Sequence, residues 1–186
     1  MTVALHACCG PCASACAPRL AELGHAVTLL FANSNIDTPE EFARRRDAAR
    51  RLAEHDGIPF AELPYDHDDW LRNVATGFED APEKGERCAR CFRYNLDRTA
   101  AFAAAHGLDA FTTSLTVSPH KVSETVFAAG RAAAAGGGPR FLEENFKKRD
   151  GFKLSLARSA ELGLYRQDYC GCEFSRRAVP ARKEAE

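Results

Sequence analysis

The stretch "VALHACCGPCASACAPRLAELGHAVTLLFAN", residues 3–33, decides the fold of this chain. It opens with a short apolar run (Val3–His6), continues through a predicted helix (Cys12–Gly24) and closes with a nearly continuous apolar run (His25–Asn33). Strands that are apolar throughout, rather than at alternate positions, are typical of a parallel sheet covered on both faces. The stretch therefore predicts a strand–helix–strand unit. Because of Pro18, the sequence does not fix the residue at which the helix begins.

The rest of the chain repeats this alternation. A helix is predicted after Thr38, a favourable N-cap, with Pro39 at its first position and Gly57 as its stop. Further strands are predicted at residues 58–66 and 108–116, and further helices at 68–77, 89–107, 120–135 and 152–163, before an irregular tail that carries two cysteines. We therefore expect an α/β fold, a parallel sheet with helices on both faces. No linker interrupts the pattern, so residues 1–186 are expected to form a single domain.

Composition narrows the class of protein. The chain has 186 residues, a formal net charge of −1 and 45% hydrophobic residues, so any nucleic-acid surface must come from local clustering of basic residues. No apolar segment approaches the roughly 18 residues of a transmembrane helix, and no secretory signal is visible. We expect a cytoplasmic chain without a membrane partner, in which a structural disulfide framework is disfavoured.

The cysteines fall into three groups. They are Cys8, Cys9, Cys12 and Cys16 after the first strand, Cys88 and Cys91 just before a long helix, and Cys170 and Cys172 in the tail. In an open parallel sheet, ligands bind outside the carboxyl ends of the strands at the topological switch point, which the first strand normally borders. The first group is therefore expected at the functional edge, and the other two groups could reach it. Cys16 lies one helical turn past Cys12 and is expected to be a core residue.

The chain has more thiols than one four-ligand metal site can use. Zinc is held by four tetrahedral ligands, and iron–sulfur clusters take three or four cysteines that often come from separate loops. The surplus indicates two metal centres, or one centre beside a redox dithiol. The first loop, "CCGPC", replaces the Gly-rich phosphate loop of nucleotide-binding domains, which disfavours a tRNA-thiolating enzyme that uses ATP.

These motifs, in this order, resemble the QueH-type epoxyqueuosine reductases, a family once known as DUF208. The matching segments span nearly the whole chain: "LHACCGPCA", "NSNIDTPEEFARR", "RCARCFRYNLDRTA", "FTTSLTVSPHK" and "GLYRQDYCGCEFS". The chain differs from the family's usual sequence at two places. Ser34 stands where family members often have Pro, and Tyr94–Asn95 stands where they often have an Arg. The segment "FLEENFKKRDGF" also varies among relatives.

The resemblance implies a Rossmann-like sheet of the adenine-nucleotide α-hydrolase-like (HUP) type. It implies the last step of queuosine biosynthesis, in which epoxyqueuosine in tRNA is reduced and the epoxide oxygen leaves as water. It also implies a 4Fe-4S cluster with an additional mononuclear iron, held by cysteines and a carboxylate. The substrate would be a tRNA with a GUN anticodon that carries epoxyqueuosine at the wobble position, and an external electron donor would supply two electrons.

On this interpretation, seven cysteines are assigned to the metal assembly: Cys8, Cys9, Cys12, Cys88, Cys91, Cys170 and Cys172. The cluster itself is assigned to all of these except Cys12, and Cys8 and Cys9 are also expected to be catalytic. Asp66, at the end of the third strand, and Asp37, just after the second, are the candidate carboxylate ligands, although either could simply cap a helix. Asp66 and Tyr165 complete the catalytic candidates, Tyr165 as a proton donor or as a packing residue of the tail.

Basic residues cluster in three places, at Arg44–Arg51, at Lys147–Arg149 and in the tail. The first cluster can form a solvated helix face with nearby acids. The tail arginines, Arg166, Arg176 and Arg177, are the preferred tRNA contacts because they lie beside the CGC motif. Candidate stacking platforms for the target base are Trp70, Phe92 and Tyr165. His6 and His120 are expected to be structural hydrogen-bonding residues.

Two other classes of function stay open at this level. A metal-free thiol–disulfide oxidoreductase would use Cys88 and Cys91 as its redox pair and would be colourless. A zinc-stabilised RNA-binding module would hold about one zinc per chain and no iron. The colour and metal content of anaerobically purified protein distinguish these classes from an iron–sulfur enzyme.

Overall fold

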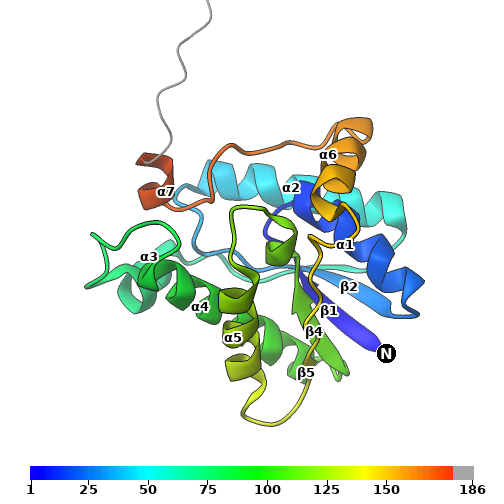
Figure 1. Ribbon diagram of the computed structural model, residues 1–186, viewed down its shortest axis with the longest axis horizontal. Coiled ribbons are helices and arrows are strands. Elements are labelled where there is room, and N and C mark those ends of the chain that lie inside the picture. The colour runs from blue at the N-terminus through cyan, green and yellow to red at the C-terminus, as the bar shows by residue number, and fades with distance from the viewer. Residues whose placement is uncertain (178–186) are drawn as a thin grey trace, which may run out of the picture.

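Five parallel strands form one sheet in the order β3-β2-β1-β4-β5 (Figure 1). The structure is a computed structural model, and it describes residues 1–177. The strands are β1 (Thr2–His6), β2 (Ala26–Phe31), β3 (Phe60–Glu62), β4 (Ala110–Thr113) and β5 (Arg140–Phe141). The helices are α1 (Gly10–Glu22), α2 (Pro39–Asp56), α3 (His67–Trp70), α4 (Glu86–Ala105), α5 (Ser123–Ala134), α6 (Gly151–Glu161) and α7 (Glu173–Arg177). A π-helical turn η1 (Leu71–Ala75) continues α3, and a 3₁₀ turn η2 (Ser114–Val117) continues β4.

Helices cover both faces of the sheet, as Figure 1 shows, with α1, α2 and α6 on one face and α4 and α5 on the other. Successive side chains of a strand point to opposite faces, so Leu5 joins the core under α1 and α2 while Ala4 joins the core under α4 and α5. Both residues are fully buried. The predicted α/β fold with a parallel, doubly covered sheet is confirmed.

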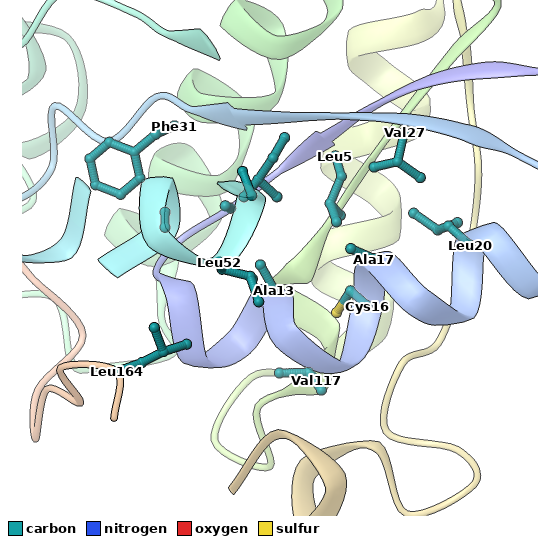
Figure 2. Close-up of a cluster of buried hydrophobic side chains, with 14 of the residues drawn as sticks. Leu5, Ala13, Cys16, Ala17, Leu20, Val27, Phe31, Leu52, Val117 and Leu164 are labelled. Carbon is teal, nitrogen blue, oxygen red and sulfur yellow. The ribbon is translucent and has the colours of Figure 1, made fainter. Parts of the chain in front are cut away.

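The core between α1 and the sheet includes one cysteine. Figure 2 shows Cys16 of α1 in the same cluster as Leu20, Leu5 of β1 and Val27 of β2. Cys16 is fully buried, and burial raises the pKa of its thiol well above the ordinary value. Such a thiol behaves as a small apolar side chain, so the prediction that Cys16 is a core residue is confirmed.

Helix α1 continues through Pro18, and a neighbouring helix explains why. A proline has no N–H to donate to the carbonyl four residues earlier, which here belongs to Ser14. The guanidinium of Arg158 in α6 donates to that carbonyl instead, over 2.6 Å. The contact therefore satisfies the freed oxygen and ties α6 to α1.

Several boundaries differ from the predicted ones. Helix α2 agrees closely, because Thr38 accepts from the N–H of Glu41 and Gly57 adopts φ 64° at the C-cap. Helix α4 begins at Glu86, so the second cysteine pair lies within its first two turns rather than before the helix. The predicted start of a helix at His120 is wrong, because α5 begins at Ser123. The tail is not wholly irregular, since it ends in α7, and the short β5 was not predicted.

The switch point of the sheet lies at the carboxyl ends of β1 and β4. The chain moves outward from β1 to β2 and β3, then crosses to β4 on the other side of β1. The loop that follows β1 therefore opens where ligands of doubly wound sheets bind, as the sequence predicts. Among residues 1–177, no helix is long and apolar enough to cross a membrane.

Candidate functional site

A buried polar bridge joins three strand ends beneath the cysteine loop. His6, the last residue of β1, lies within hydrogen-bond distance of Thr113 of β4 (Nδ1 to Oγ1, 2.9 Å) and of Asn33 after β2 (Nε2 to Oδ1, 3.2 Å). Asn33 also donates from Nδ2 to the carbonyl of Ala7 over 2.8 Å. Burial lowers the pKa of His6. His6 thus connects the strand ends, which agrees with its expected structural role.

The first three cysteines meet in one place. Their sulfur atoms, on Cys8, Cys9 and Cys12, all lie within 4.8 Å of one another. Cys9 is the N-cap of α1, and its sulfur accepts from the N–H of Cys12 over 3.4 Å. The sulfur atoms of Cys8 and Cys9 are 3.9 Å apart, and Ser114 of η2 donates to the sulfur of Cys8 over 3.5 Å. The loop and the start of α1 therefore form a compact thiol group.

Hydrogen bonds within this group give the three thiols different pKa values. Hydrogen bonds from Cys12 and Cys8 lower the pKa of Cys9 well below the ordinary value. Hydrogen bonds with Cys8 and Cys9, together with burial, raise the pKa of Cys12 well above it. The pKa of Cys8 rises to about 11, because the hydrogen bond with Cys12 lowers it less than the contact with Cys9 and burial raise it. Cys9 is therefore the most acidic thiol of the group, and its sulfur accepts from Cys8 and from the N–H of Cys12.

The spacing of these sulfur atoms fits a thiolate-bound metal. Two sulfurs bound to one tetrahedral metal at about 2.3 Å each are about 3.8 Å apart, and Cys8 and Cys9 are separated by 3.9 Å. The group supplies three soft ligands, which suit iron–sulfur or zinc centres. These three cysteines could therefore hold a metal centre without a large movement of the backbone.

The second pair of cysteines is carried by α4. Cys88 and Cys91 are three residues apart on this helix and so lie on the same face. Burial raises the pKa of both thiols. Cys91 and Cys172 both pack against the small cluster of Trp70, Val74 and Ala75, which places the second and third groups of cysteines near one another.

The third group is fastened to α2 by a buried ion pair. Arg45, which is 1% exposed, donates to Glu41 over 2.6 Å and to the carbonyls of Cys170 and Tyr169 over 2.8 and 3.3 Å. Gly171 follows with φ 142°, and a Cβ there would lie 3.1 Å from the guanidinium of Arg45. The turn of the CGC motif therefore requires glycine and is built around this arginine.

Asp37 makes further contacts with the same tail. Tyr169 donates from its hydroxyl to Oδ1 of Asp37 over 2.9 Å, and Arg176 contacts Oδ2 at 3.0 Å. The backbone N–H of Asp37 donates to the carbonyl of Gly171 over 2.9 Å. Burial and the hydrogen bond to Asp37 raise the pKa of Tyr169. Asp37 thus holds the tail and is not among the residues that line the thiol cavity.

All three cysteine groups contribute to the wall of one cavity of about 380 Å³. Cys8 and Cys12 line it from the first loop, Cys91 from α4 and Cys170 from the tail. Asn35 and Asn95, both buried, add amide groups to the wall, and Nδ2 of Asn95 donates to Oδ1 of Asn35 over 3.1 Å. The cavity therefore combines thiols with a few polar groups at the switch point, as ligand sites commonly do.

Lys121 brings a positive charge into this wall. Its Nζ lies 2.9 Å from the sulfur of Cys170 and 5.5 Å from the ring centre of Phe92. Burial lowers the pKa of Lys121, but the charge and the hydrogen bond of Cys170 raise it by more. The ammonium group therefore stands ready to offset negative charge on the surrounding sulfurs.

Some predicted site residues lie elsewhere. Asp66 is exposed and caps α3, where it accepts from the N–H of Asp69 over 2.8 Å. Tyr165 donates to both carboxylate oxygens of Glu41, over 2.8 and 3.1 Å. Neither residue lines the cavity. The catalytic and ligand roles of Asp66, Asp37 and Tyr165 stay predictions.

The residues predicted to contact tRNA do not lie together in the structure. Arg166 lines the cavity, with its guanidinium 5.5 Å from the ring centre of Phe152. Arg176 already contacts Asp37, and Arg177 lies 5.8 Å from the ring centre of Phe174. Of the predicted stacking platforms, Trp70 and Phe92 are 1% and 6% exposed, and only Phe92 belongs to the cavity wall. His120 is exposed at the cavity rim.

Sequence reasoning missed several residues of the site. Arg45 was grouped with a solvated helix face, but it is the one arginine of that face among residues 1–177 that is fully buried. Lys121 and Asn95 lie inside segments that carry the family resemblance, which was the available signal. Phe152 gave no signal, because a single aromatic at a helix start is usually a packing residue. Their roles depend on contacts between segments that are distant in sequence.

A doubly wound parallel sheet whose switch point opens into a thiol-lined cavity defines a class of cysteine-dependent α/β proteins. Solved structures with this fold include the U34-tRNA thiolase NcsA from Methanococcus maripaludis with its [4Fe-4S] cluster. It has a TM-score of 0.61 and 14% identity, and the match covers 94% of this chain and 61% of that one. A predicted tRNA methyltransferase subunit from Methanocaldococcus jannaschii has a TM-score of 0.59 and 15% identity, over 87% and 75% of the two chains. These likenesses confirm the expected Rossmann-like parallel sheet.

The sequence comparisons define the family within this class. The family model "Epoxyqueuosine reductase QueH" matches residues 3–178. The epoxyqueuosine reductase QueH of Acinetobacter baylyi is 36% identical over 93% of this chain and 79% of its own length. The QueH proteins of Streptococcus pyogenes and Thermotoga maritima are 34% and 33% identical over 94% of this chain, and over 70% and 90% of their own lengths. The chain belongs to the QueH family of epoxyqueuosine reductases.

Proposed function

We propose that this protein reduces epoxyqueuosine in tRNA to queuosine, with an iron–sulfur cluster held by its cysteines. The observation that carries the proposal is the convergence of three cysteine groups, far apart in sequence, on one cavity at the switch point. The reaction consumes two electrons and two protons, and the epoxide oxygen leaves as water. Membership of the QueH family supports the substrate, and a cytoplasmic location follows from that substrate.

The ligands fall into two sets in this proposal. Cys8, Cys9 and Cys12 hold one side of the metal assembly, and their grouping supports this assignment. The second set, Cys88, Cys91, Cys170 and Cys172, comes from α4 and the tail. A bound iron–sulfur cluster would supply the electrons one at a time, and an external donor would reduce it. A separate mononuclear iron with a carboxylate ligand stays a prediction, since Asp37 and Asp66 lie outside the cavity wall.

The protein's own residues prepare the cavity for this chemistry. Hydrogen bonds from its neighbours lower the pKa of Cys9, which favours the thiolate form that binds metal. Lys121 offsets negative charge near Cys170, and Asn35 and Asn95 offer amide groups to a polar substrate. The wall also keeps bulk water away from the sulfurs, because Cys9 is fully buried and the other site thiols are partly buried.

The decisive experiment measures conversion directly. Anaerobically reconstituted protein is incubated with a strong reductant and tRNA that carries epoxyqueuosine, and the tRNA is then digested for mass spectrometry. The expected product is a nucleoside lighter by one oxygen atom. Full metal occupancy without conversion would contradict the proposal and favour the thiol–disulfide alternative. Zinc at one equivalent with no iron, from iron-replete cells, would favour a zinc-stabilised RNA-binding module.

A further inference from the structure

The loop before α6 carries a concentration of positive charge beside the cavity. Residues 147–153, which we call the basic loop and which include the first three residues of α6, read KKRDGFK, with four basic residues and one acid. Lys148, Arg149 and Lys153 are exposed, whereas Phe152 is half-buried and lines the cavity. Four residues of extended chain span at most about 14 Å, so these charges lie close to the place where a substrate must enter.

The basic loop is held in one shape by a tight turn. Arg149 and Asp150 adopt φ 58° and 56°, a left-handed conformation that residues with a side chain rarely adopt. Gly151 follows, and a Cβ there would lie only 1.7 Å from the carbonyl oxygen of Phe146. Two consecutive non-glycine residues in this region persist only where the surroundings enforce them, and they are frequent at binding sites.

Contacts on both sides fix this turn to the body of the protein. Arg19 of α1 donates to the carbonyls of Lys148 and Asn145, over 3.1 and 3.3 Å. Lys147 donates from Nζ to the carbonyl of Lys121, which lines the cavity, and to Ser123 at 3.2 Å. The loop is therefore positioned before any ligand arrives, which lowers the entropic cost of binding.

The exposed charges of the loop have no acidic partner of their own. Within residues 1–177, no carboxylate lies within 4.0 Å of the charged atoms of Lys148, Arg149 or Lys153. The groove between α1 and α6 next to the loop is lined by two acids, Glu22 and Glu161, and by four basic residues. Two of these, Arg19 and Arg158, pair with Glu144 and Asp56, whereas Lys148 and Arg149 make no such pair. Exposed basic side chains without an ion-pair partner are the groups that bind a phosphate backbone.

An aromatic side chain and an arginine stand where this loop meets the cavity. Phe152 and Arg166 both line the wall, with the guanidinium 5.5 Å from the ring centre. Bases that leave their stack in RNA are held against aromatic rings or arginine planes. Trp70 and Phe92 are buried and present no such surface, whereas Phe152 is half-buried and Arg166 is exposed.

We propose that this edge is the tRNA-docking surface of the protein. The basic loop contacts phosphates through Lys148, Arg149 and Lys153, while Phe152 and Arg166 stack against an unpaired base at the cavity mouth. The inference rests on the proposed function, because it takes tRNA as the substrate. It keeps Arg166 from the tail-based expectation but replaces Arg176 and Arg177 with the basic loop, since Arg176 contacts Asp37 and has its charge already offset.

The first test removes the charges of the loop. In Lys148→Ala/Arg149→Ala/Lys153→Ala, the slope of log affinity against log salt for tRNA should fall by about 2 to 3 units, because each lost phosphate contact removes about 0.7 to 0.9 units. The kcat should stay near the wild-type value while KM rises. The matched control, Arg93→Ala/Arg131→Ala/Arg140→Ala, removes the same charge from exposed positions away from the cavity and should keep the wild-type slope.

The second test addresses the stacking pair. Phe152→Leu keeps an apolar side chain and should weaken binding of tRNA carrying epoxyqueuosine by about 5- to 100-fold at unchanged salt slope, the effect expected for one lost base–aromatic contact. An unchanged melting temperature would show that the fold is intact.

The outcomes separate this proposal from the proposed function. Suppose the wild type binds and converts tRNA, and the salt slope of tRNA affinity is unchanged in the triple variant but smaller in Arg176→Ala/Arg177→Ala. The proposed docking surface is then wrong, and the proposed function stands. If the salt slope of tRNA affinity falls in the triple variant but the metal-loaded wild type does not convert epoxyqueuosine, the docking surface stands and the proposed function is wrong. A wild-type protein that does not bind tRNA overturns both.

Discussion

Cys9 combines three features that suit the metal-ligand role proposed for it. It caps α1, it accepts from the N–H of Cys12, and the hydrogen bonds from Cys12 and Cys8 lower its pKa well below the ordinary value. Metals bind the thiolate and not the thiol, so the other thiols must release protons when a metal enters. The burial of Cys88 and Cys91, which raises their pKa values, makes that release harder at low pH.

Replacing Cys9 by serine should lower the iron content of anaerobically reconstituted protein several-fold, because serine keeps the size but loses the thiolate. Cys16→Ala is the matched control, since Cys16 lies in the same helix but faces the core. It should keep the wild-type iron and sulfide content and cost about 1 kcal/mol of stability for the buried volume it removes. Metal analysis and urea unfolding check both variants. Equal iron loss in the two variants would show that α1 unfolds rather than loses a ligand.

His6 should make the metal-free protein sensitive to acid. Burial lowers its pKa from the ordinary 6.5, so the unfolded chain takes up a proton near pH 6.5 that the folded chain does not. The free energy of unfolding should therefore fall as the pH drops below about 6.5, by at most about 1.4 kcal/mol per pH unit. Urea unfolding at pH 7, 6 and 5 measures the slope, which should be smaller in His6→Gln. His106→Gln, at an exposed position, should keep the wild-type slope.

At the scale of elements, α2 determines where the tail lies. Its first two turns carry Glu41 and Arg45, and the loop before it carries Asp37, so three charged residues hold the tail from one side. An ion pair this deeply buried adds little stability over an apolar pair, but removing one partner leaves an uncompensated charge. Its value here is that it fixes the orientation of the CGC turn.

Arg45→Met should therefore detach the tail and cost about 3–5 kcal/mol of stability. Alkylation followed by mass spectrometry should show faster modification of Cys170 and Cys172, with Cys16 still protected. Arg46→Met is the matched control, because the next residue is partly exposed and pairs with Asp47 on the surface. It should leave the alkylation rates unchanged. Modification of Cys16 at the same rate as the tail cysteines would instead indicate global unfolding.

Elements with local signals could be predicted from the sequence, and those without could not. Thr38, Pro39 and Gly57 define α2 by their own backbone preferences, so its boundaries were accessible. The passage of α1 through Pro18 depends on Arg158, which lies far along the chain. The short strand β5 forms only because β4 offers it an edge, since two residues carry no periodic pattern.

At the scale of the whole molecule, the cysteine pattern and the fold rule were enough to place the site at the switch point. The cysteine pattern and the fold rule could not predict which individual residues line the cavity, because the lining depends on tertiary contacts. Asp66 illustrates the limit, since a residue at a strand end can face the cavity or cap the next helix, and here it caps α3. Arg45 shows the opposite case: it is expected on the surface from the sequence, but it is buried because the tail crosses α2 at this residue.

Metal removal should loosen the molecule at the site more than in the sheet. The proposed ligands come from both ends of the chain and from α4, so a bound centre would add a direct link among these three segments. Each kcal/mol of binding energy should raise Tm by about 2–4 °C for a protein of this size. Hydrogen exchange should show protection gained on metal loading at residues 7–12, 84–91 and 166–175. Uniform protection across β1 and β4 would contradict this expectation.

The wide separation of the cysteine groups in sequence has a consequence for biosynthesis. Cys172 is added to the nascent chain roughly 160 residues after Cys8, which takes on the order of 10 to 30 s at 5–20 residues per second. Throughout that time, the N-terminal thiols exist without the partners that complete their cavity. They are then most exposed to adventitious copper or zinc and to oxidants, so assembly of the proposed cluster would have to follow translation. Cells that express this chain faster than they can deliver iron should accumulate mismetallated protein.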